Sequence, residues 1–289
     1  MGSRYFALVT GASRGFGKSV SKELVRRIGP QHSLDIVLVA RNERGLESTA
    51  TDIKAIAEGL GHARNVVVRQ ESVDLADFER LEHRLDGVFA DVDPNVYSRA
   101  VLVNNAGAIV HMGRTNDSPS FLALKQEMDL NVTACLWVTS RFAGLFGANG
   151  PIKPLTGIWT NDAEPQQSTE AAAAAGPSSA GSNVIVNISS LAAVMPMKYW
   201  AAYSAGKAAR DMFHRVLATE QAEIGGLKVL NYAPGPMDTD MGAQIRESGF
   251  TSTFEWVDVG ASASKCIRLA LGNDFESGSH IDFFDKEYD

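Results

Sequence analysis

The stretch Thr10-Gly11-Ala12-Ser13-Arg14-Gly15-Phe16-Gly17 decides the fold, because it follows an apolar run at 5–9 and opens a helical pattern. Glycines at a strand-to-helix turn allow tight backbone geometry. They also let a pyrophosphate rest on the helix N-terminus, where free N–H groups and the helix dipole favour anions. A glycine pattern alone is weak evidence, but this position is the one that dinucleotide binding requires. The stretch therefore predicts a cofactor-binding turn made of Gly11, Ser13, Arg14, Gly15, Phe16 and Gly17.

Short β-branched runs alternate with helix-period segments along the rest of the chain. Near-continuous apolar strands are typical of a parallel sheet that helices cover on both faces. Further strands are expected at 36–39, 66–68, 100–103, 184–186, 229–231 and 280–284, and helices at 16–28, 43–60, 75–90, 119–147, 200–224 and 257–271. Repeated βα units of this kind predict one α/β domain over 1–289, a doubly wound parallel sheet of the Rossmann type.

Residues 147–182 do not follow this alternation. The segment is rich in Ala, Ser, Pro and Gly, a composition typical of flexible surface loops. A loop of this length usually counts against an assignment of elements, but clear patterns resume on either side. We expect an insertion, in which a short helix over 170–175 is an alternative.

The composition limits the partners. The chain has 289 residues, a formal net charge of -7 and no basic block, which argues against binding of nucleic acid or an anionic membrane. No apolar run approaches a membrane span, and glycine interrupts the first residues too early for a signal peptide. Cys135 and Cys266 are far apart and the six histidines show no paired spacing, so neither a disulfide nor a metal site is predicted. We expect a soluble, cytoplasmic protein.

The end of the second expected strand bears on the choice of dinucleotide. A carboxylate there is typical of NAD selection, whereas a guanidinium suits the 2′-phosphate of NADP. Arg41 and Asn42 occupy this position, and Arg14 adds a second guanidinium from the glycine turn. Two forked donors around one dianion favour NADPH; two solvated surface arginines are the alternative.

Two further strand ends carry candidate cofactor residues. They are Asp74 and Leu75 after the third strand, and Asn104, Ala106 and Gly107 after the fourth. The carboxyl ends of parallel strands form the ligand crevice. For Asp74 and Asn104 a turn-forming Asx residue is the structural alternative, and the sequence leaves that choice open.

A second motif places a phenol and an ammonium four residues apart, at Tyr203 and Lys207 in a run of small residues. In a helix, positions i and i+4 share one face. A free phenol, with a pKa of about 10, is a poor acid–base partner at neutral pH. An ammonium about 4 Å away favours the phenolate by roughly 4 kcal/mol before desolvation is subtracted. On spacing alone, an interfacial Tyr beside a solvated Lys is the more frequent arrangement.

Taken in order, five motifs resemble those of the short-chain dehydrogenase/reductase family: TGASRGFG (10–17), NNAG (104–107), Ser190, Tyr203-x-x-x-Lys207 and Pro234-Gly-Pro-Met-Asp-Thr239. Together they span nearly the whole chain. The stretches 186–212, 231–241 and 277–286 are most similar to members of the family that reduce pterins. The insertion at 147–182 departs from that pattern.

The resemblance implies catalytic roles at matching positions. Tyr203 would donate a proton to the substrate carbonyl oxygen, and Lys207 would also hold the nicotinamide ribose. Ser190 would hydrogen-bond the carbonyl, with Ser189 as the neighbouring candidate. Asn131 matches a helix asparagine that supports a water-linked proton path, and a buried polar helix residue is its alternative.

The resemblance also implies residues that contact cofactor and substrate. Thr239, after Pro234 and Gly235, matches the residue that binds the nicotinamide carboxamide, and a helix N-cap is its alternative. Asp282 matches the pterin anchor, with Asp285 as a neighbouring alternative. Trp200 and Met237 would flank the pterin plane, and core packing is the alternative for both.

Three functions remain in competition. The resemblance implies an NADPH-dependent reductase acting on side-chain ketones of 6-substituted pterins, and the same machinery would serve a general carbonyl reductase for aldehydes and diketones. A non-catalytic NADPH-binding regulatory protein is a third class, but binding alone needs no proton donor such as Tyr203. The resemblance further implies a homodimer through the helices at 119–147 and 200–224.

Overall fold

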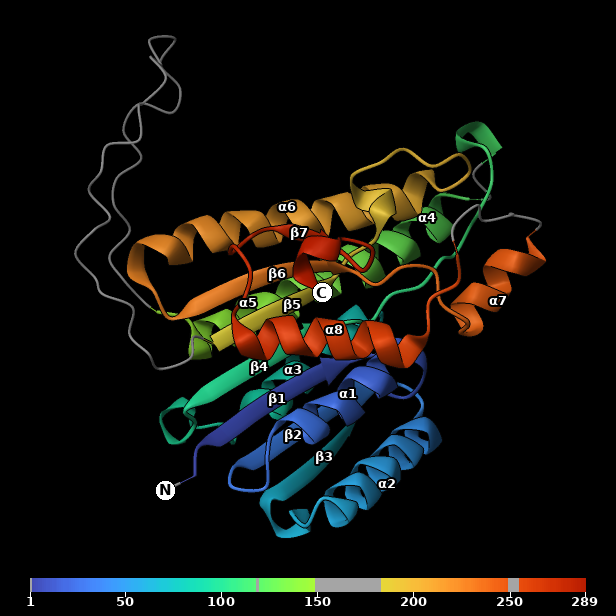
Figure 1. Cartoon of the computed structure of the whole chain (residues 1–289). Helices are drawn as coiled ribbons and strands as arrows, with labels where there is room; N and C mark the ends of the chain where they lie inside the picture. The colour runs from blue at the N-terminus through green and yellow to red at the C-terminus, as the bar shows by residue number, and fades with distance from the viewer. Residues whose placement is uncertain (1, 118–119, 149–182, 249–254) are drawn as a thin grey trace, which may run out of the picture.

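A parallel sheet forms the centre of the computed structural model, which describes residues 2–117, 120–148, 183–248 and 255–289. Within these residues the sheet has seven strands in the order β3-β2-β1-β4-β5-β6-β7. They are β1 Arg4–Thr10, β2 Ser33–Ala40, β3 Val66–Ser72, β4 Arg99–Asn104, β5 Asn183–Ile188, β6 Leu227–Ala233 and β7 His280–Asp282 (Figure 1). The strand order reverses between β1 and β4, and the predicted doubly wound fold is confirmed.

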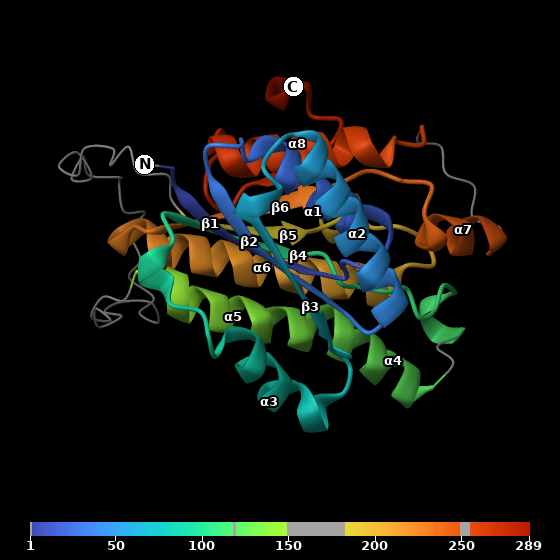
Figure 2. The same ribbon diagram turned by 90° about the horizontal axis from the view of Figure 1, so that it is seen from below.

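Helices cover both faces of the sheet (Figure 2). On one face lie α1 Gly15–Arg27, α2 Glu43–Gly59 and α8 Val259–Gly272, and on the other α3 Phe78–Phe89, α4 Phe121–Met128, α5 Ala134–Phe146 and α6 Ala201–Ile224. Successive strand residues point to opposite faces, so Ala7 and Val9 pack under α1 while Phe6 and Leu8 pack under α3 and α5. None of the helices in the described ranges is long and apolar enough to cross a membrane.

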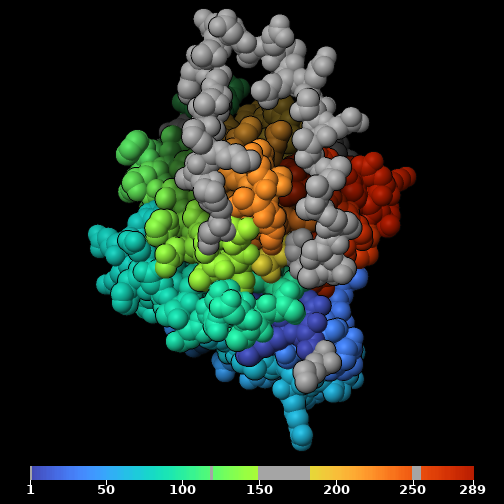
Figure 3. Space-filling view, turned by 90° about the vertical axis from the view of Figure 1, so that its left-hand side faces the viewer, coloured from blue at the N-terminus to red at the C-terminus, as the bar shows by residue number. Residues whose placement is uncertain are grey.

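The end of α8 is tied to the sheet by a buried cation. Arg99, at the start of β4, donates to the carbonyls of Ala270 (2.6 Å) and Leu271 (2.7 Å) and to Oδ1 of Asn273 (2.8 Å). The last carbonyls of a helix have no partner within the helix and carry partial negative charge. Arg99 therefore satisfies these acceptors and fixes the C-terminal end of α8 at the amino ends of the strands, the end of the sheet that faces the viewer in Figure 3.

The expected helix at 119–147 differs from the structure. It is two helices, α4 and α5, joined by a π-helical segment, Asp129–Thr133. Within that segment Asn131 accepts from the backbone N–H of Ala108 (2.9 Å) and donates to its carbonyl (2.8 Å). This contact joins residues that are far apart in sequence, so helical periodicity alone did not predict the interruption.

Two other boundaries differ. The helix α7, Asp240–Glu247, was not among the expected helices, because a helix of two turns carries little periodic signal.

The last strand was expected to reach residue 284 but ends at Asp282. There the N–H of Asp282 donates to the carboxylate of Asp285, and the carboxylate of Asp282 accepts from the N–H of Phe284. Of the expected insertion at 147–182, residues 149–182, including the alternative helix at 170–175, lie outside the described residues.

The glycine turn brings α1 very close to the end of β1. Gly11 and Gly15 have φ of +65° and +53°, values that side-chain-bearing residues rarely adopt. A Cβ at Gly17 would lie 2.4 Å from the carbonyl oxygen of Gly11 and 2.5 Å from Nδ2 of Asn105. The absence of a side chain at Gly17 is therefore what allows this approach.

We predict that Gly17→Ala lowers the free energy of unfolding by about 1–3 kcal/mol, because an added methyl group forces packed backbone apart. The matched control is Gly59→Ala in α2, where a Cβ meets nothing within 4 Å and alanine is the better helix former. Urea denaturation of both variants checks this. Equal stability of the two would contradict the close approach.

Candidate active site

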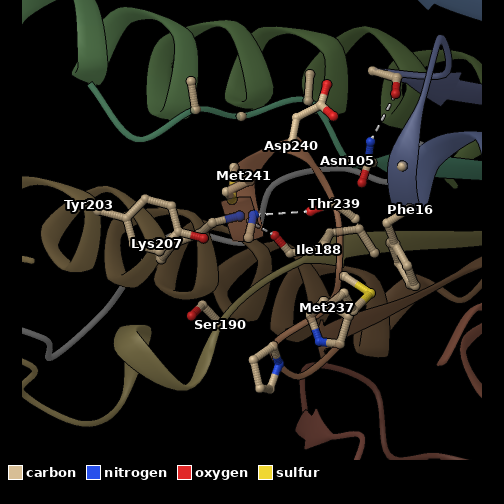
Figure 4. A pocket seen from close by; sticks show the side chains of 18 of the residues that line it. Phe16, Asn105, Ile188, Ser190, Tyr203, Lys207, Met237, Thr239, Asp240 and Met241 are labelled. Carbon is tan, nitrogen blue, oxygen red and sulfur yellow. Dashed lines mark hydrogen bonds between the residues drawn. The ribbon is translucent and has the colours of Figure 1, made fainter. Parts of the chain in front are cut away.

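A cavity of ≈ 750 Å³ opens at the carboxyl ends of the strands. Ligands of doubly wound sheets bind in this crevice, where the strand order reverses. The predicted site residues that line it are Gly11, Ser13, Arg14, Gly15, Phe16, Arg41, Asp74, Leu75, Ala106, Gly107, Ser190, Trp200, Tyr203, Lys207, Pro234, Gly235, Met237, Thr239 and Asp282. In Figure 4, Ser190, Tyr203 and Lys207 lie at one end, and Phe16 and Asn105 at the other.

Four predicted residues lie outside the wall of this cavity: Gly17, Asn42, Asn104 and Asn131. Gly17 packs beneath the glycine turn. Asn42 is the N-cap of α2 and accepts from the N–H of Gly45 (2.9 Å). Asn104 is buried and donates to Thr139 (2.6 Å), so it shapes the site from behind.

Three structural alternatives raised by the sequence are present in the structure, and two of these residues, Thr239 and Asp74, also line the cavity. Thr239 caps α7 by accepting from Gly242, and Asp74 accepts from the N–H of Ala76 in a tight turn. Asn131 is buried, and both atoms of its amide bond Ala108. Ser190 lines the cavity, whereas the neighbouring Ser189 is buried away from it.

Asn105 is a site residue that the sequence reasoning missed. Its side chain donates to the carbonyls of Thr10 (3.0 Å) and Gly11 (3.2 Å), and it lines the cavity. Consecutive residues of a strand point to opposite sides. Because Asn104 points into the protein toward Thr139, Asn105 points to the other side. The other lining residues that were missed include Met197, Asp240, Met241, Ile245, Glu255 and Trp256. Asp285, the alternative to Asp282, lines the cavity as well.

Tyr203 and Lys207 lie on one face of α6 and are both almost fully buried. The amine of Lys207 donates to the carbonyl of Ile188 (2.6 Å) and lies 5.5 Å from the centre of the Tyr203 ring. Burial raises the pKa of Tyr203 to about 12, against the opposing effects of the Arg210 charge and a hydrogen bond with Ser190. Burial, followed by the Arg210 charge, holds the pKa of Lys207 well below its usual value.

Lys207 is not among the groups that lower the pKa of Tyr203 here, so its acidifying role stays a prediction. Desolvation disfavours the charged form of both groups, and the cation that lowers the pKa of Tyr203 is Arg210. Tyr203 consequently keeps its proton at neutral pH, as a proton donor must.

The glycine turn fits the diphosphate of a dinucleotide. The N-terminus of α1 has no side-chain cap and no acidic residue in its first turn, so its N–H groups are available to an anion. Arg14 is paired with Asp240, and Nη1 of Arg41 lies 4.0 Å from Asp74 Oδ2. Both guanidinium groups line the cavity and are largely exposed, which suits contact with a second phosphate.

The far end of the cavity is apolar with a carboxylate at its edge. Trp200 packs edge-on against Tyr203 at 5.5 Å, and methionines 197 and 241 pack beside them. Burial raises the pKa of Asp282 above its usual value. Among the described residues no cluster of three or more potential metal ligands occurs.

Comparisons with known proteins agree with this arrangement. The sequence profile of the short chain dehydrogenase family matches residues 5–152 and 168–249. Sepiapterin reductase of Bos taurus is 33% identical, covering 98% of this chain and 96% of its own length. Benzil reductase of Bacillus subtilis is 27% identical over 83% of this chain and 78% of its own length. Actinorhodin polyketide ketoreductase with NADPH superposes with a TM-score of 0.67, at 22% identity, over 98% of this chain and 97% of its own.

The chain belongs to the short-chain dehydrogenase family and is an oxidoreductase. Members of this family use a nicotinamide cofactor. Sepiapterin reductases of Xenopus laevis and Meriones unguiculatus are 32% and 33% identical to the chain, each over 96% of this chain.

A buried histidine lies behind the site. His214 makes hydrogen bonds to Thr139 Oγ1 (3.0 Å) and to the carbonyl of Arg210 (2.8 Å). Burial lowers the pKa of His214 to about 4 from the ordinary 6.5. The unfolded chain therefore binds more protons than the folded chain between these two pH values.

We predict that the free energy of unfolding decreases as the pH falls from about 6.5 to about 4, with a His214 contribution on the order of 3 kcal/mol. Urea denaturation across this range should show a flatter pH dependence in His214→Leu than in the unsubstituted protein. The exposed His83→Leu is the control and should keep the original slope. An unchanged slope in His214→Leu would show that His214 is not held neutral.

Proposed function

We propose that this enzyme is a sepiapterin reductase, which uses NADPH to reduce side-chain carbonyls of 6-substituted pterins in tetrahydrobiopterin synthesis. The observation that carries the proposal is the 33% identity to Bos taurus sepiapterin reductase over 98% of this chain. It is supported by the presence of Ser190, Tyr203, Lys207 and Asp282 around one cavity.

The cofactor would lie in the cavity, between the glycine turn and α6. Its diphosphate suits the N-terminus of α1, and its 2′-phosphate suits Arg14 and Arg41. Lys207 would hold the nicotinamide ribose, and Thr239 the carboxamide. The bound nicotinamide supplies the hydride.

Tyr203 would supply the proton. With a pKa of about 12 its phenol is protonated at neutral pH, so the O–H can pass its proton to the carbonyl oxygen as that oxygen becomes an alkoxide. Ser190 would hydrogen-bond the same oxygen and orient it. Asn131 would act indirectly, because its amide holds the backbone of Ala108 beside the cavity.

The pterin would lie at the apolar end. A half-buried carboxylate at Asp282 can accept the two adjacent N–H donors of a pterin ring. Trp200 and Met237 line the same cavity and offer apolar contact. Burial raises the pKa of Asp282. Two N–H donors from a pterin would offset this effect, because hydrogen bonds to a carboxylate stabilise its charged form.

We also propose a homodimer through the helices at 119–147 and 200–224. On α6 the exposed residues Ala205, Ala209, Met212 and Val216 form one stripe at helical spacing, and Trp137 of α5 is exposed as well. Small and apolar residues in such a stripe suit close packing of helices.

We also place the enzyme in the cytoplasm, where Cys135 and Cys266, both buried and free, would stay reduced.

The deciding experiment measures NADPH oxidation by the purified protein from the loss of NADPH absorbance. Sepiapterin, benzil and smaller diketones are compared, each over a range of concentrations. Sepiapterin should have the highest kcat/KM. Tyr203→Phe should lower kcat by about 100-fold or more, because it removes the proton donor. Turnover of diketones without sepiapterin would favour a general carbonyl reductase, which the similarity to benzil reductase also supports. Cofactor binding without any turnover would favour a regulatory protein.

We predict that Arg41→Asp shifts the ratio of kcat/KM for NADPH and NADH toward NADH by at least about tenfold, because a carboxylate repels the 2′-phosphate. Steady-state kinetics with both cofactors measures the ratio. Arg44→Asp is the matched control, since Arg44 is exposed on α2 and does not line the cavity. If the two variants behave alike, Arg41 does not bind the phosphate.

We predict that Asp282→Ala raises the KM for sepiapterin by about tenfold or more, through loss of a charged hydrogen-bond acceptor. The KM for a small dicarbonyl should change far less, because such a substrate has no N–H donors. Asp285→Ala tests the neighbouring carboxylate in the same assay. Equal effects of Asp282→Ala on both substrates would argue against a pterin anchor.

A further inference from the structure

Arg14 and Asp240 join the glycine turn to the helix α7 at the wall of the cavity. Nη1 of Arg14 donates to Oδ2 of Asp240. Arg14 is the N-cap residue of α1, and Asp240 is the first residue of α7. Both side chains line the cavity, and they are 69% and 68% exposed. The guanidinium that is expected to meet a 2′-phosphate therefore already has a negatively charged partner.

The backbone that carries Asp240 is held by contacts on both sides. Thr239 precedes Asp240 on the same segment (Figure 4) and caps α7 by accepting from the N–H of Gly242 (3.3 Å). Further along α7, the side chain of Gln244 donates to the carbonyl of Ile109 (2.9 Å), in the loop after β4. These contacts keep the carboxylate of Asp240 at the cavity wall independently of its guanidinium partner.

The side chain of Arg14 can change its partner while its backbone stays in place. The carbonyl of Arg14 accepts from the N–H of Lys18 in the first turn of α1 (3.2 Å). The next residue, Gly15, packs so closely that a Cβ there would lie 3.4 Å from Cγ2 of Thr239. The guanidinium itself is at the end of a long, largely exposed stem. An anion that binds in the cavity can therefore draw the guanidinium away from α7 without moving either helix.

A 2′-phosphate and the Asp240 carboxylate offer Arg14 the same kind of contact. Both are anions that accept from the forked donors of a guanidinium, and a phosphate dianion carries the larger charge. Because the pair with Asp240 is exposed, breaking it changes an equilibrium constant by only about two- to fivefold. NADH has no 2′-phosphate, so its binding leaves the pair intact. The competition therefore affects NADPH alone.

The other expected phosphate ligand, Arg41, is not held in this way. Its Nη1 lies 4.0 Å from Oδ2 of Asp74, and Oδ1 of Asp74 accepts from the N–H of Ala76 (3.0 Å). A separation of that size is too long for a hydrogen bond. Arg41 can therefore bind a phosphate without giving up a hydrogen bond to Asp74, and the competition is concentrated on Arg14.

We propose that Asp240 is a specificity-determining residue, which competes with the 2′-phosphate of NADPH for the guanidinium of Arg14. Asp240 thereby lowers the affinity for NADPH and leaves the affinity for NADH unchanged. The inference rests on the proposed binding of NADPH by Arg14, but it does not depend on the pterin substrate. The preference of the enzyme for NADPH is then a balance between the attraction of two guanidinium groups and the competition from this carboxylate.

Four variants separate this competition from other effects of charge. Asp240→Asn removes the charge and keeps the size of the side chain. Asp238→Asn is the matched control, because Asp238 is an exposed aspartate on the same segment that pairs with Arg246 (2.7 Å) and does not line the cavity. Arg14→Gln removes the guanidinium, and the double variant of Arg14→Gln with Asp240→Asn completes a double-mutant cycle. Circular dichroism and thermal unfolding establish that each variant is folded.

The readout is the Kd of NADPH and of NADH, measured by isothermal titration calorimetry with no carbonyl substrate present. In Asp240→Asn the Kd of NADPH should fall by about two- to fivefold, and that of NADH should stay within about 1.5-fold. Asp238→Asn should leave both Kd values unchanged. In the Arg14→Gln background, Asp240→Asn should also leave both unchanged, because the guanidinium for which Asp240 competes has been removed.

Three results would overturn the inference. An unchanged Kd of NADPH in Asp240→Asn would show that Asp240 does not compete for Arg14, and a higher Kd would show that Asp240 orients Arg14 toward the phosphate. An equal fall of the Kd in the Arg14→Gln background would show that Asp240 repels the phosphate directly. Failure of the proposed cofactor contact looks different: Arg14→Gln would then leave the ratio of the two Kd values unchanged, and this inference would fail with it.

Discussion

The structure depends on the contact between the ends of β1 and β4, where the strand order reverses. Thr10 Oγ1 accepts from the N–H groups of Asn105 and Ala106, both at 3.0 Å, and Asn105 returns a hydrogen bond to the carbonyl of Thr10 (3.0 Å). Gly17 lies against this contact with no side chain. This packing sets where α1 starts beside the crevice, because a side chain at Gly17 would collide with Gly11 and Asn105 and push α1 away from the strand ends.

Burial is the largest influence on the pKa values of both Tyr203 and Lys207 on α6. The sequence suggested that an ammonium group at Lys207 would lower the pKa of the Tyr203 phenol. In the folded chain both groups are buried away from water. This desolvation raises the pKa of Tyr203 and lowers that of Lys207, so it favours the neutral form of each. Arg210 lies fully buried behind this pair, and its three hydrogen bonds make it part of the same wall.

The substrate end of the cavity is assembled from segments that are distant in the chain. Trp200 is the N-cap residue of α6, Met241 lies in α7, and Asp282 ends the last strand. Apolar walls beside the half-buried carboxylates of Asp282 and Asp285 suit a flat molecule with hydrogen-bond donors along one edge. Lys265 helps to hold this end, because its amine donates to the carbonyls of Phe283 (2.9 Å) and Asp285 (2.7 Å) that follow the strand.

The sequence by itself determined the alternation of strands and helices, the glycine turn and the spacing of Tyr203 and Lys207, because these depend on local periodicity and turn chemistry. Only the tertiary structure decided that Asn105 and not Asn104 faces the cavity, that Asp129–Thr133 is π-helical, and that Arg210 lies behind the active site. The reason is physical. The direction of a side chain and its loss of water are set by what packs against it, and those neighbours come from other parts of the chain.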